Sequence, residues 1–291
     1  MLLDTRPGRH TTETPTDREY QQQKRNPFHS NMGKKGKKAQ AGKPKKLKPK
    51  DIGKRLDALV KKLEEELNGA DLFAPLPPTE DCPICFVPLP RFLGEISYKI
   101  CCGKSICRGC EEESIAVSKK ENAQNDRECI SCPFCRVPAP TSENIARIME
   151  ERILTNNSEA LCIMGGYMLK GGNGFPKDEL RAFDCLIRSI ELGSAESCGK
   201  LAAWFREGTG APKDMKRANL CMKIGALRGD IYCRHNIGVR EYNAGNHEVG
   251  IRHFKLAAEA GYQVSLNGLR DVYNADGKMP GKEFISKKCL G

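Results

Sequence analysis

Nine cysteines fall within the 54 residues from Cys82 to Cys135, and this cluster constrains the fold more than any other feature of the chain. Six of them form three Cys-x-x-Cys pairs, which begin at Cys82, Cys107 and Cys132. Two thiolates separated by two residues on a tight turn can occupy adjacent corners of one zinc tetrahedron. In the first and third pairs a proline follows the first cysteine and pre-sets the turn. With two further adjacent cysteines the cluster offers eight thiolates, which predict two zinc ions per chain and leave Cys129 over.

Cysteine usage also indicates the cellular compartment. Fifteen cysteines accompany an N-terminus that begins Met1-Leu2-Leu3 and then turns polar, without the apolar stretch of a secretory signal. We therefore expect an intracellular, reducing environment, cytoplasmic or nuclear, with metal ligation in place of disulfides. No run of about 18 apolar residues is present, so the sequence predicts no membrane-spanning helix.

Each structural zinc would contribute about 10–16 kcal/mol of folding energy, and an all-thiolate site leaves no open position for catalysis.

The cysteine order C-x-x-C, C-C-G-K-x-I-C-x-x-C, C-P-F-C-R resembles an all-cysteine variant of the RING-type zinc finger over residues 79–138. The resemblance implies a small α+β module, stapled by zinc, whose two metal sites interleave along the chain. It implies that the first zinc is held by Cys82, Cys85, Cys107 and Cys110. It implies that the second zinc is held by Cys101, Cys102, Cys132 and Cys135.

One position departs from the family's pattern. Lys104 lies where the usual RING finger has a zinc-binding histidine, and a lysine ammonium cannot ligate zinc. The all-cysteine variant resolves this by using both Cys101 and Cys102 in the second site. Adjacent ligands on one metal are geometrically strained, so the alternative in which Cys129 replaces one of them stays open.

RING fingers recruit a ubiquitin-conjugating enzyme and act as ubiquitin ligases, so the resemblance implies an enzyme without a covalent catalytic residue. Such a module orders the thioester conjugate so that a substrate lysine attacks it in a reactive geometry. Three residues match the family's contact motif: Ile84 in the first zinc loop, Pro133 in the last, and Arg136 directly after the last cysteine. The planar donor fork of Arg136 suits two acceptors at once. The alternative function is a non-catalytic, zinc-binding adaptor for protein–protein interaction.

The C-terminal half of the chain repeats itself. Residues 172–178 (GNGFPKD) match residues 208–214 (GTGAPKD) at an offset of 36, as Gly193 matches Gly229. A third unit ends at Gly261, and a partial fourth follows it. Each unit is expected to hold two helices, because an aspartate stands at an N-cap position and a glycine follows the second helix. Periods of 20–50 residues indicate a solenoid.

The spacing G-x-G-x-P-K-D, followed four residues later by Ala, resembles the Sel1-like repeat, a relative of the tetratricopeptide repeat, over residues 158–276. The resemblance implies an all-α solenoid of helix pairs whose concave face binds a protein substrate. Cys162 and Cys198 are 36 residues apart, as are Cys185 and Cys221. We expect each pair to occupy equivalent, buried packing positions.

Residues 1–50 hold nearly all of the net charge of +11, with 14 Lys or Arg against four Asp or Glu. Because this segment has almost no aliphatic residues, we expect a disordered basic tail. Basic clusters occur in nuclear-import signals and in arms that contact RNA, and a merely solubilising tail is the alternative. The rest of the chain is nearly neutral, so nucleic acid is expected to bind only through the tail. Residues 277–291 are expected to form a C-terminal tail.

Two helical segments flank the zinc module. In residues 51–78 an apolar stripe at helical spacing precedes a break at Pro75-Leu76-Pro77-Pro78. The stripe consists of Ile52, Leu56, Leu59, Leu63 and Leu67. It is too short to favour a coiled-coil dimer, so we expect it to pack against the next domain. Residues 139–157 are expected to form a linker helix capped by Thr141 or Ser142.

Overall fold

The computed structural model describes residues 48–91, 93–122, 131–172 and 174–275. The basic tail up to residue 47, the C-terminal segment from residue 276, and Cys129 and Cys289 lie outside the described residues. The expected disorder of the tail and the alternative role of Cys129 therefore stay predictions.

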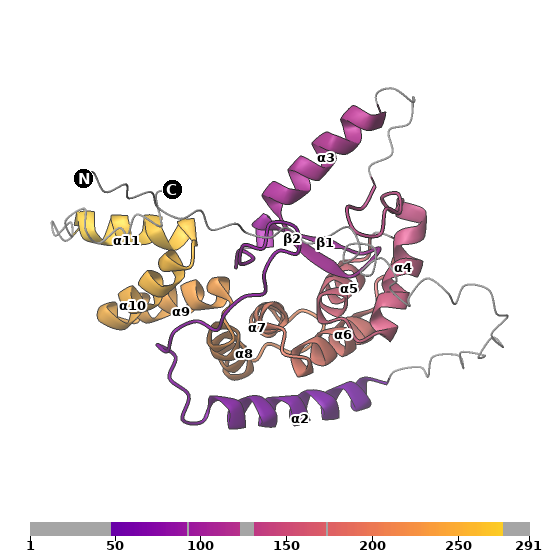
Figure 1. The fold of residues 1–291 in the computed structure, drawn as a ribbon. Helices are drawn as coiled ribbons and strands as arrows, with labels where there is room; N and C mark the ends of the chain where they lie inside the picture. The colour runs from indigo at the N-terminus through magenta and orange to yellow at the C-terminus, as the bar shows by residue number, and fades with distance from the viewer. Residues whose placement is uncertain (1–47, 92, 123–130, 173, 276–291) are drawn as a thin grey trace, which may run out of the picture. The chain divides into compact units, whose positions relative to one another are not determined.

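The described residues are mostly helical, with one short antiparallel hairpin (Figure 1). The first elements are helix α2 (Pro49–Leu67), the 3₁₀ turn η2 (Leu93–Glu95), strands β1 (Ile96–Lys99) and β2 (Lys104–Cys107), and helix α3 (Arg108–Asn122). The later helices are α4 (Ser142–Leu154), α5 (Ser158–Lys170), α6 (Glu179–Glu191), α7 (Ala195–Glu207), α8 (Met215–Leu227), α9 (Ile231–Asn243), α10 (His247–Glu259) and α11 (Gln263–Ala275). None of the described helices is long and apolar enough to cross a bilayer.

The cysteine-rich segment folds around the β1–β2 hairpin. The two strands are antiparallel, and their register pairs Ile96 with Cys107 and Lys99 with Lys104. The loop of four residues turns at Gly103, whose φ of 73° lies in the left-handed region that favours glycine. The Gly103 N–H closes the turn by donating to the Lys99 carbonyl at 2.7 Å. Helix α3 follows β2 directly, which gives the segment a small α+β arrangement.

The C-terminal half is a helical solenoid, as predicted. Helix α5 packs against α6, α7 against α8, and α9 against α10. The predicted N-caps are confirmed: the side chain of Asp178 accepts the Arg181 N–H, and that of Asp214 accepts the Lys216 and Arg217 N–H groups. The predicted glycines that follow the second helices have φ of 95° at position 193, 99° at 229 and 93° at 261.

Between the first two repeats, the spacing of the first helices exceeds the predicted period of 36 residues by one residue. The N-caps of α5 and α7 are Asn157 and Ser194, 37 residues apart, whereas those of α6 and α8 are 36 apart. The reason is that the loop after α5 holds one residue more than the loop after α7. The predicted equivalence of Cys162 and Cys198 is therefore wrong, although both are buried. Cys185 and Cys221 are equivalent and buried, as predicted.

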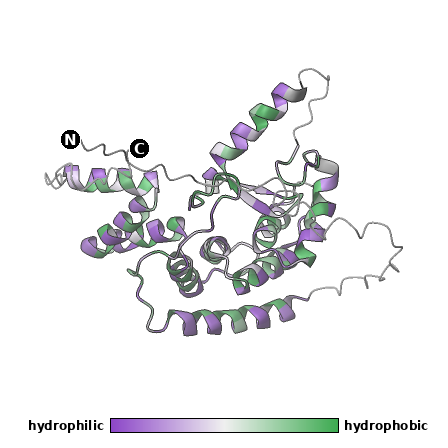
Figure 2. Cartoon of the chain, viewed as in Figure 1, coloured by the Kyte–Doolittle hydropathy of each residue, from purple (hydrophilic) through white to green (hydrophobic). Residues whose placement is uncertain are grey.

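Helix α2 belongs to the core of the repeats. The apolar side chains that the sequence singled out are buried at Ile52, Leu56, Leu59 and Leu63, and the helix packs against α6 and α8. The hydropathy of α2 alternates along its length, as an amphipathic helix requires (Figure 2). The stripe thus packs within the chain, but its partner is the solenoid and not the zinc module that follows it in sequence.

Ion pairs fix the polar edges of the α2 interface. Arg228 donates to both carboxylate oxygens of Glu66, at 2.8 and 2.7 Å. Arg217 lies 2.8 Å from Asp57, and Arg55 pairs with Asp184. Helix α2 supplies the acidic partner in two of these pairs and the basic partner in the third. This arrangement of charge helps to specify how α2 lies on the repeats.

Helix α4 also joins this core, because Met149 and Ile153 are buried in it. Thr141 is its N-cap residue, as predicted, but no side-chain hydrogen bond caps the helix there. The segment predicted as a linker helix is therefore packed against the repeats, and it contacts α5.

Candidate metal centre

Eight cysteines converge in two groups of four. The first group is Cys82, Cys85, Cys107 and Cys110, and the second is Cys101, Cys102, Cys132 and Cys135. Within each group the sulfur atoms all lie within 4.8 Å of one another. These are the two sets that the RING resemblance implies, and the adjacent pair contributes both of its sulfurs to the second set. The described residues do not include Cys129, so its role is left open.

The two groups alternate along the chain. The first group takes its members from either side of Cys101 and Cys102, and the second group takes the rest of its members from beyond Cys110. Metal ions bound in both groups would cross-link segments that are far apart in sequence. That linkage would stabilise a segment that has little apolar core of its own.

Sulfur–sulfur distances test whether the groups fit a metal ion. Cys85 Sγ lies 3.8 Å from Cys107 Sγ, and Cys102 Sγ lies 3.7 Å from Cys132 Sγ. Both distances greatly exceed the S–S bond of about 2.05 Å, so neither pair is a disulfide. Two sulfurs bound to a tetrahedral zinc at about 2.3 Å are about 3.8 Å apart. The residues therefore fit zinc in the number, kind and spacing of their donor atoms.

Two equivalent turns carry the first and last Cys-x-x-Cys pairs. The Cys82 N–H donates to the Val87 carbonyl, and the Cys132 N–H donates to the Val137 carbonyl 50 residues later, at 2.8 and 2.9 Å. In each turn the residue after the second cysteine has a positive φ, 57° at Phe86 and 56° at Arg136. Non-glycine residues adopt this conformation at a cost, which the hydrogen bonds of the turn offset. Each turn is called a knuckle below.

The knuckles also prepare their first cysteine to act as a thiolate. Burial alone would raise the pKa of the Cys82 thiol, but backbone N–H groups of Cys107, Cys85 and Ile84 lower this pKa to about 6. Burial likewise opposes ionisation of Cys132, and the N–H groups of Cys135 and Phe134 lower the pKa of its thiol to about 7. Zinc binds the thiolate form, so these N–H groups favour metal binding.

Other thiols in the same groups have raised pKa values. Burial, followed by hydrogen bonds with Cys132 and Cys135, raises the pKa of the Cys101 thiol. For the thiol of Cys110, the hydrogen bond with Cys107 is the largest cause of a raised pKa. Neighbouring sulfurs cannot all ionise without a cation between them, and a divalent ion removes this repulsion.

The predicted partner-contacting residues lie on the two knuckles. Ile84 is 36% exposed in the first, whereas Pro133 is partly buried and Arg136 is exposed in the second. Phe134 of the second knuckle packs on the small cluster that contains Cys82 of the first site and Ile106. This contact brings the second knuckle against the core of the first metal site.

Sequence reasoning missed the other exposed apolar side chains of the knuckles. Phe86 is 77% exposed, and Val87 and Val137 are also exposed. The available signal was the Val-Pro dipeptide that follows both knuckles. Lys104, which cannot ligate zinc, lies over the Phe134 ring at 5.4 Å from its centroid, in a cation–π contact.

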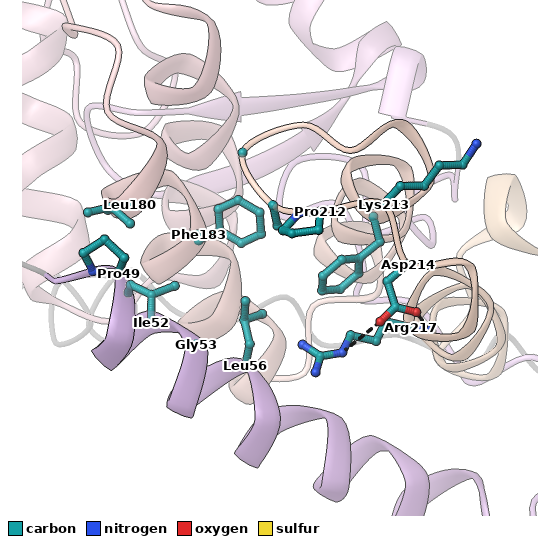
Figure 3. A pocket seen from close by; sticks show the side chains of 13 residues that line it. Pro49, Ile52, Gly53, Leu56, Leu180, Phe183, Pro212, Lys213, Asp214 and Arg217 are labelled. Atoms are coloured by element: carbon teal, nitrogen blue, oxygen red, sulfur yellow. Dashed lines mark hydrogen bonds and ion pairs between the residues drawn. The ribbon is translucent and has the colours of Figure 1, made fainter.

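A cavity of about 390 Å³ lies between the start of α2 and the repeats. Figure 3 shows Leu180 and Phe183 of α6 near Ile52 and Leu56 of α2, so its wall on this side is apolar. At its charged end Arg217 pairs with the Asp214 carboxylate at 3.2 Å. The cavity therefore presents packing surface and a satisfied ion pair, which do not indicate a reaction.

Comparison with known proteins bears on the repeats. A Sel1 repeat protein from Oxalobacter formigenes is 19% identical over 62% of this chain and 73% of its own, with a TM-score of 0.45. The protective antigen c5321 of uropathogenic Escherichia coli, which displays an SLR fold, is 13% identical over 79% of this chain and 48% of its own, with a TM-score of 0.44. No curated protein sequence matches the chain.

The family comparison matches the Sel1 repeat to residues 158–194, 195–230 and 237–262. The first two matches begin at α5 and α7, and their lengths reproduce the repeat of 37 residues followed by one of 36. The cysteine-rich segment precedes these matches. The helix pairs of the C-terminal half are therefore Sel1 repeats, which imply protein–protein interaction.

Proposed function

We propose that residues 79–138 form a RING-type module that binds two zinc ions and recruits a ubiquitin-conjugating enzyme, while the Sel1 repeats hold a protein substrate. The observation that carries this proposal is the alternation of the two thiolate groups along the chain. An interleaved pair of four-sulfur sites is the arrangement that a RING finger requires. The zinc ions would be structural, and neither has a free coordination position.

The exposed side chains of the knuckles support a docking surface. Ile84, Phe86 and Val87 present apolar surface on the first knuckle, and Val137 on the second. The exposed guanidinium of Arg136 stands beside the last ligand, Cys135, so its position depends on the metal. Arg136 would donate to acceptors on ubiquitin and the conjugating enzyme, and thereby hold the thioester in a reactive orientation.

The experiment combines metal analysis with a ubiquitination assay of the full chain. We expect two zinc ions per chain and ubiquitin chains formed with at least one of a broad panel of conjugating enzymes. Ile84→Ala and Arg136→Ala should abolish transfer and leave the zinc content at two. Leu154→Ala and Arg147→Ala are matched controls, because both residues are exposed on α4 and belong to neither knuckle. Two bound zinc ions without transfer by any enzyme of the panel would refute the ligase proposal.

The adaptor is the second candidate, because Sel1 repeats alone account for protein binding. In this case zinc stabilises a second binding module and no ubiquitin is transferred. The two candidates differ in a complementation assay in cells. Ile84→Ala and Arg136→Ala would leave the cellular role of an adaptor intact, whereas substitutions on the repeats would remove it.

A further inference from the structure

The loop of the β1–β2 hairpin is where the second thiolate group meets the repeats. Arg152, in the last turn of α4, donates from Nε to the carbonyl of Ile100 at 3.0 Å. A terminal nitrogen of the same guanidinium donates to the carbonyl of Cys101. Both carbonyls belong to the turn that carries the adjacent cysteines of the second group. One side chain from the repeat side therefore holds the backbone of this metal-binding loop.

A second contact links the hairpin to the first repeat. The hydroxyl of Tyr98, on β1, donates to Asn157 Oδ1 at 2.9 Å. The same oxygen accepts the backbone N–H of Ala160 at 2.8 Å, because Asn157 is the N-cap of α5. The hairpin is thus hydrogen-bonded to the residue that caps the first helix of the Sel1 repeats.

The loop also packs closely against these groups. A Cβ atom at Gly103 would lie 3.5 Å from Asn157 Nδ2 and 3.7 Å from Arg152 Cδ. Tyr98 and Ile100 pack on the hydrophobic core that contains the repeats. The hydrogen bonds therefore lie in a partly buried interface, where they contribute more than on an open surface.

The first thiolate group has different surroundings. Its cysteines Cys82 and Cys110 pack with Ile106 in a small cluster within the cysteine-rich segment. In the part of the chain that the structure describes, no hydrogen bond joins a cysteine of this group to the repeats. The segment after the first knuckle reaches the repeats through Arg91, which donates to the carbonyl of Gly229 at 3.5 Å, so this link does not involve the backbone of a metal-binding cysteine.

We infer that the second thiolate group, with its zinc ion, is a joint between the cysteine-rich module and the Sel1 repeats, and that Arg152 is its positioning residue. Zinc would fix the sulfurs of Cys101 and Cys102, while Arg152 fixes the carbonyls of the same turn. Each restraint lowers the conformational entropy of the loop, so the other restraint forms at a smaller entropic cost. Zinc binding and the hydrogen bonds of Arg152 therefore stabilise one another. The inference rests on the zinc-binding part of the proposed function and not on ligase activity.

Zinc release from the full chain tests the effect of the joint on the metal. The zinc-loaded protein is mixed with excess chelator, and the released metal is followed with a metallochromic indicator. Arg152→Ala removes both charge-assisted hydrogen bonds to the loop and should speed the release of one zinc ion at least about tenfold, the effect of losing one such bond, and leave the release of the other ion unchanged. Tyr98→Phe should speed the release of the same zinc ion by a smaller factor. This variant keeps the aromatic ring and its packing, so it also serves as the test if Arg152→Ala does not fold. Arg147→Ala, on the exposed side of the same helix, is the control.

Hydrogen exchange tests the opposite direction of the coupling. Removal of zinc from the wild-type chain should reduce the amide protection of residues 98–103 and of the first turn of α5. The same treatment should leave the protection of α9 and α10 unchanged.

Three outcomes would overturn the inference while zinc binding stands. They are an unchanged release rate in Arg152→Ala and Tyr98→Phe, equal acceleration of both zinc ions, or unaltered protection of α5 after chelation. A wild-type chain that holds no zinc would overturn the proposed function as well, and the initial metal content distinguishes this case.

Discussion

Substitution of Leu63 by alanine tests the position of α2 on the repeats. Leu63 is 1% exposed and belongs to the same hydrophobic core as the repeat helices. Truncation of a fully buried leucine removes its transfer free energy and leaves a cavity, which together cost about 3 kcal/mol. For a folded unit of this size, 1 kcal/mol shifts the melting temperature by about 2–4 °C. We therefore expect Leu63→Ala to lower the melting temperature by about 6–12 °C.

Circular dichroism with saturating zinc measures this shift, because excess metal keeps the zinc-dependent part of the stability constant. Lys62→Ala is the control, since Lys62 is exposed on the same helix and the helix propensity of lysine is close to that of alanine. A loss below about 1 kcal/mol in Leu63→Ala would mean that α2 is not packed as described. The melting temperature should not depend on protein concentration. A marked concentration dependence would favour the coiled-coil dimer over the contact with α6 and α8.

Four further substitutions probe the repeats by chemical denaturation. Gly250→Ala places a Cβ 2.8 Å from the Gly238 carbonyl oxygen and should cost about 1–3 kcal/mol, whereas Gly268→Ala, with no atom within 4 Å, should be neutral or stabilising. Asp178→Ala removes the N-cap acceptor of α6 and should cost about 1 kcal/mol. Burial, and then the charge of Arg234, lowers the pKa of His253 from 6.5 to about 4. The unfolded chain therefore binds more protons, and stability present above pH 6.5 is lost as the pH falls towards 4. A His253→Gln variant should lose less of its stability over this range than the wild type; an identical pH profile would contradict the assignment.

The features that could be predicted from the sequence are those encoded by local spacing. A thiolate pair on a turn of four residues needs only two intervening positions, so the knuckles at Cys82 and Cys132 are visible in the sequence. N-caps such as Asp178 and Asp214 are equally local, because their partners lie two or three residues away. The one-residue error in the repeat period arose because the glycines of the loops after α5 and α7 were aligned, although the first of these loops is one residue longer.

The features that could not be predicted depend on contacts between distant segments. The apolar stripe of α2 shows that a partner is needed, but its pattern does not distinguish the repeats from the zinc module. Arg152 gave no signal, because an arginine in the last turn of a helix is common and its acceptors are backbone carbonyls about 50 residues away. Backbone acceptors leave no residue-type pattern in a sequence.

The segment between α2 and the zinc module shows the consequence for function. Its prolines predict a break in the chain and a linker after the helix, but Arg234, 1% exposed, donates to the carbonyl of Leu72 at 2.5 Å. The guanidinium of Arg252 lies 3.8 Å from the centroid of the Phe73 ring. A movement of the zinc module relative to the repeats would therefore disturb these contacts as well as those of Arg152. In the proposed ligase, restraint of the zinc module by such contacts would make the distance of a substrate lysine from the docking site on the repeats decide whether it meets the thioester.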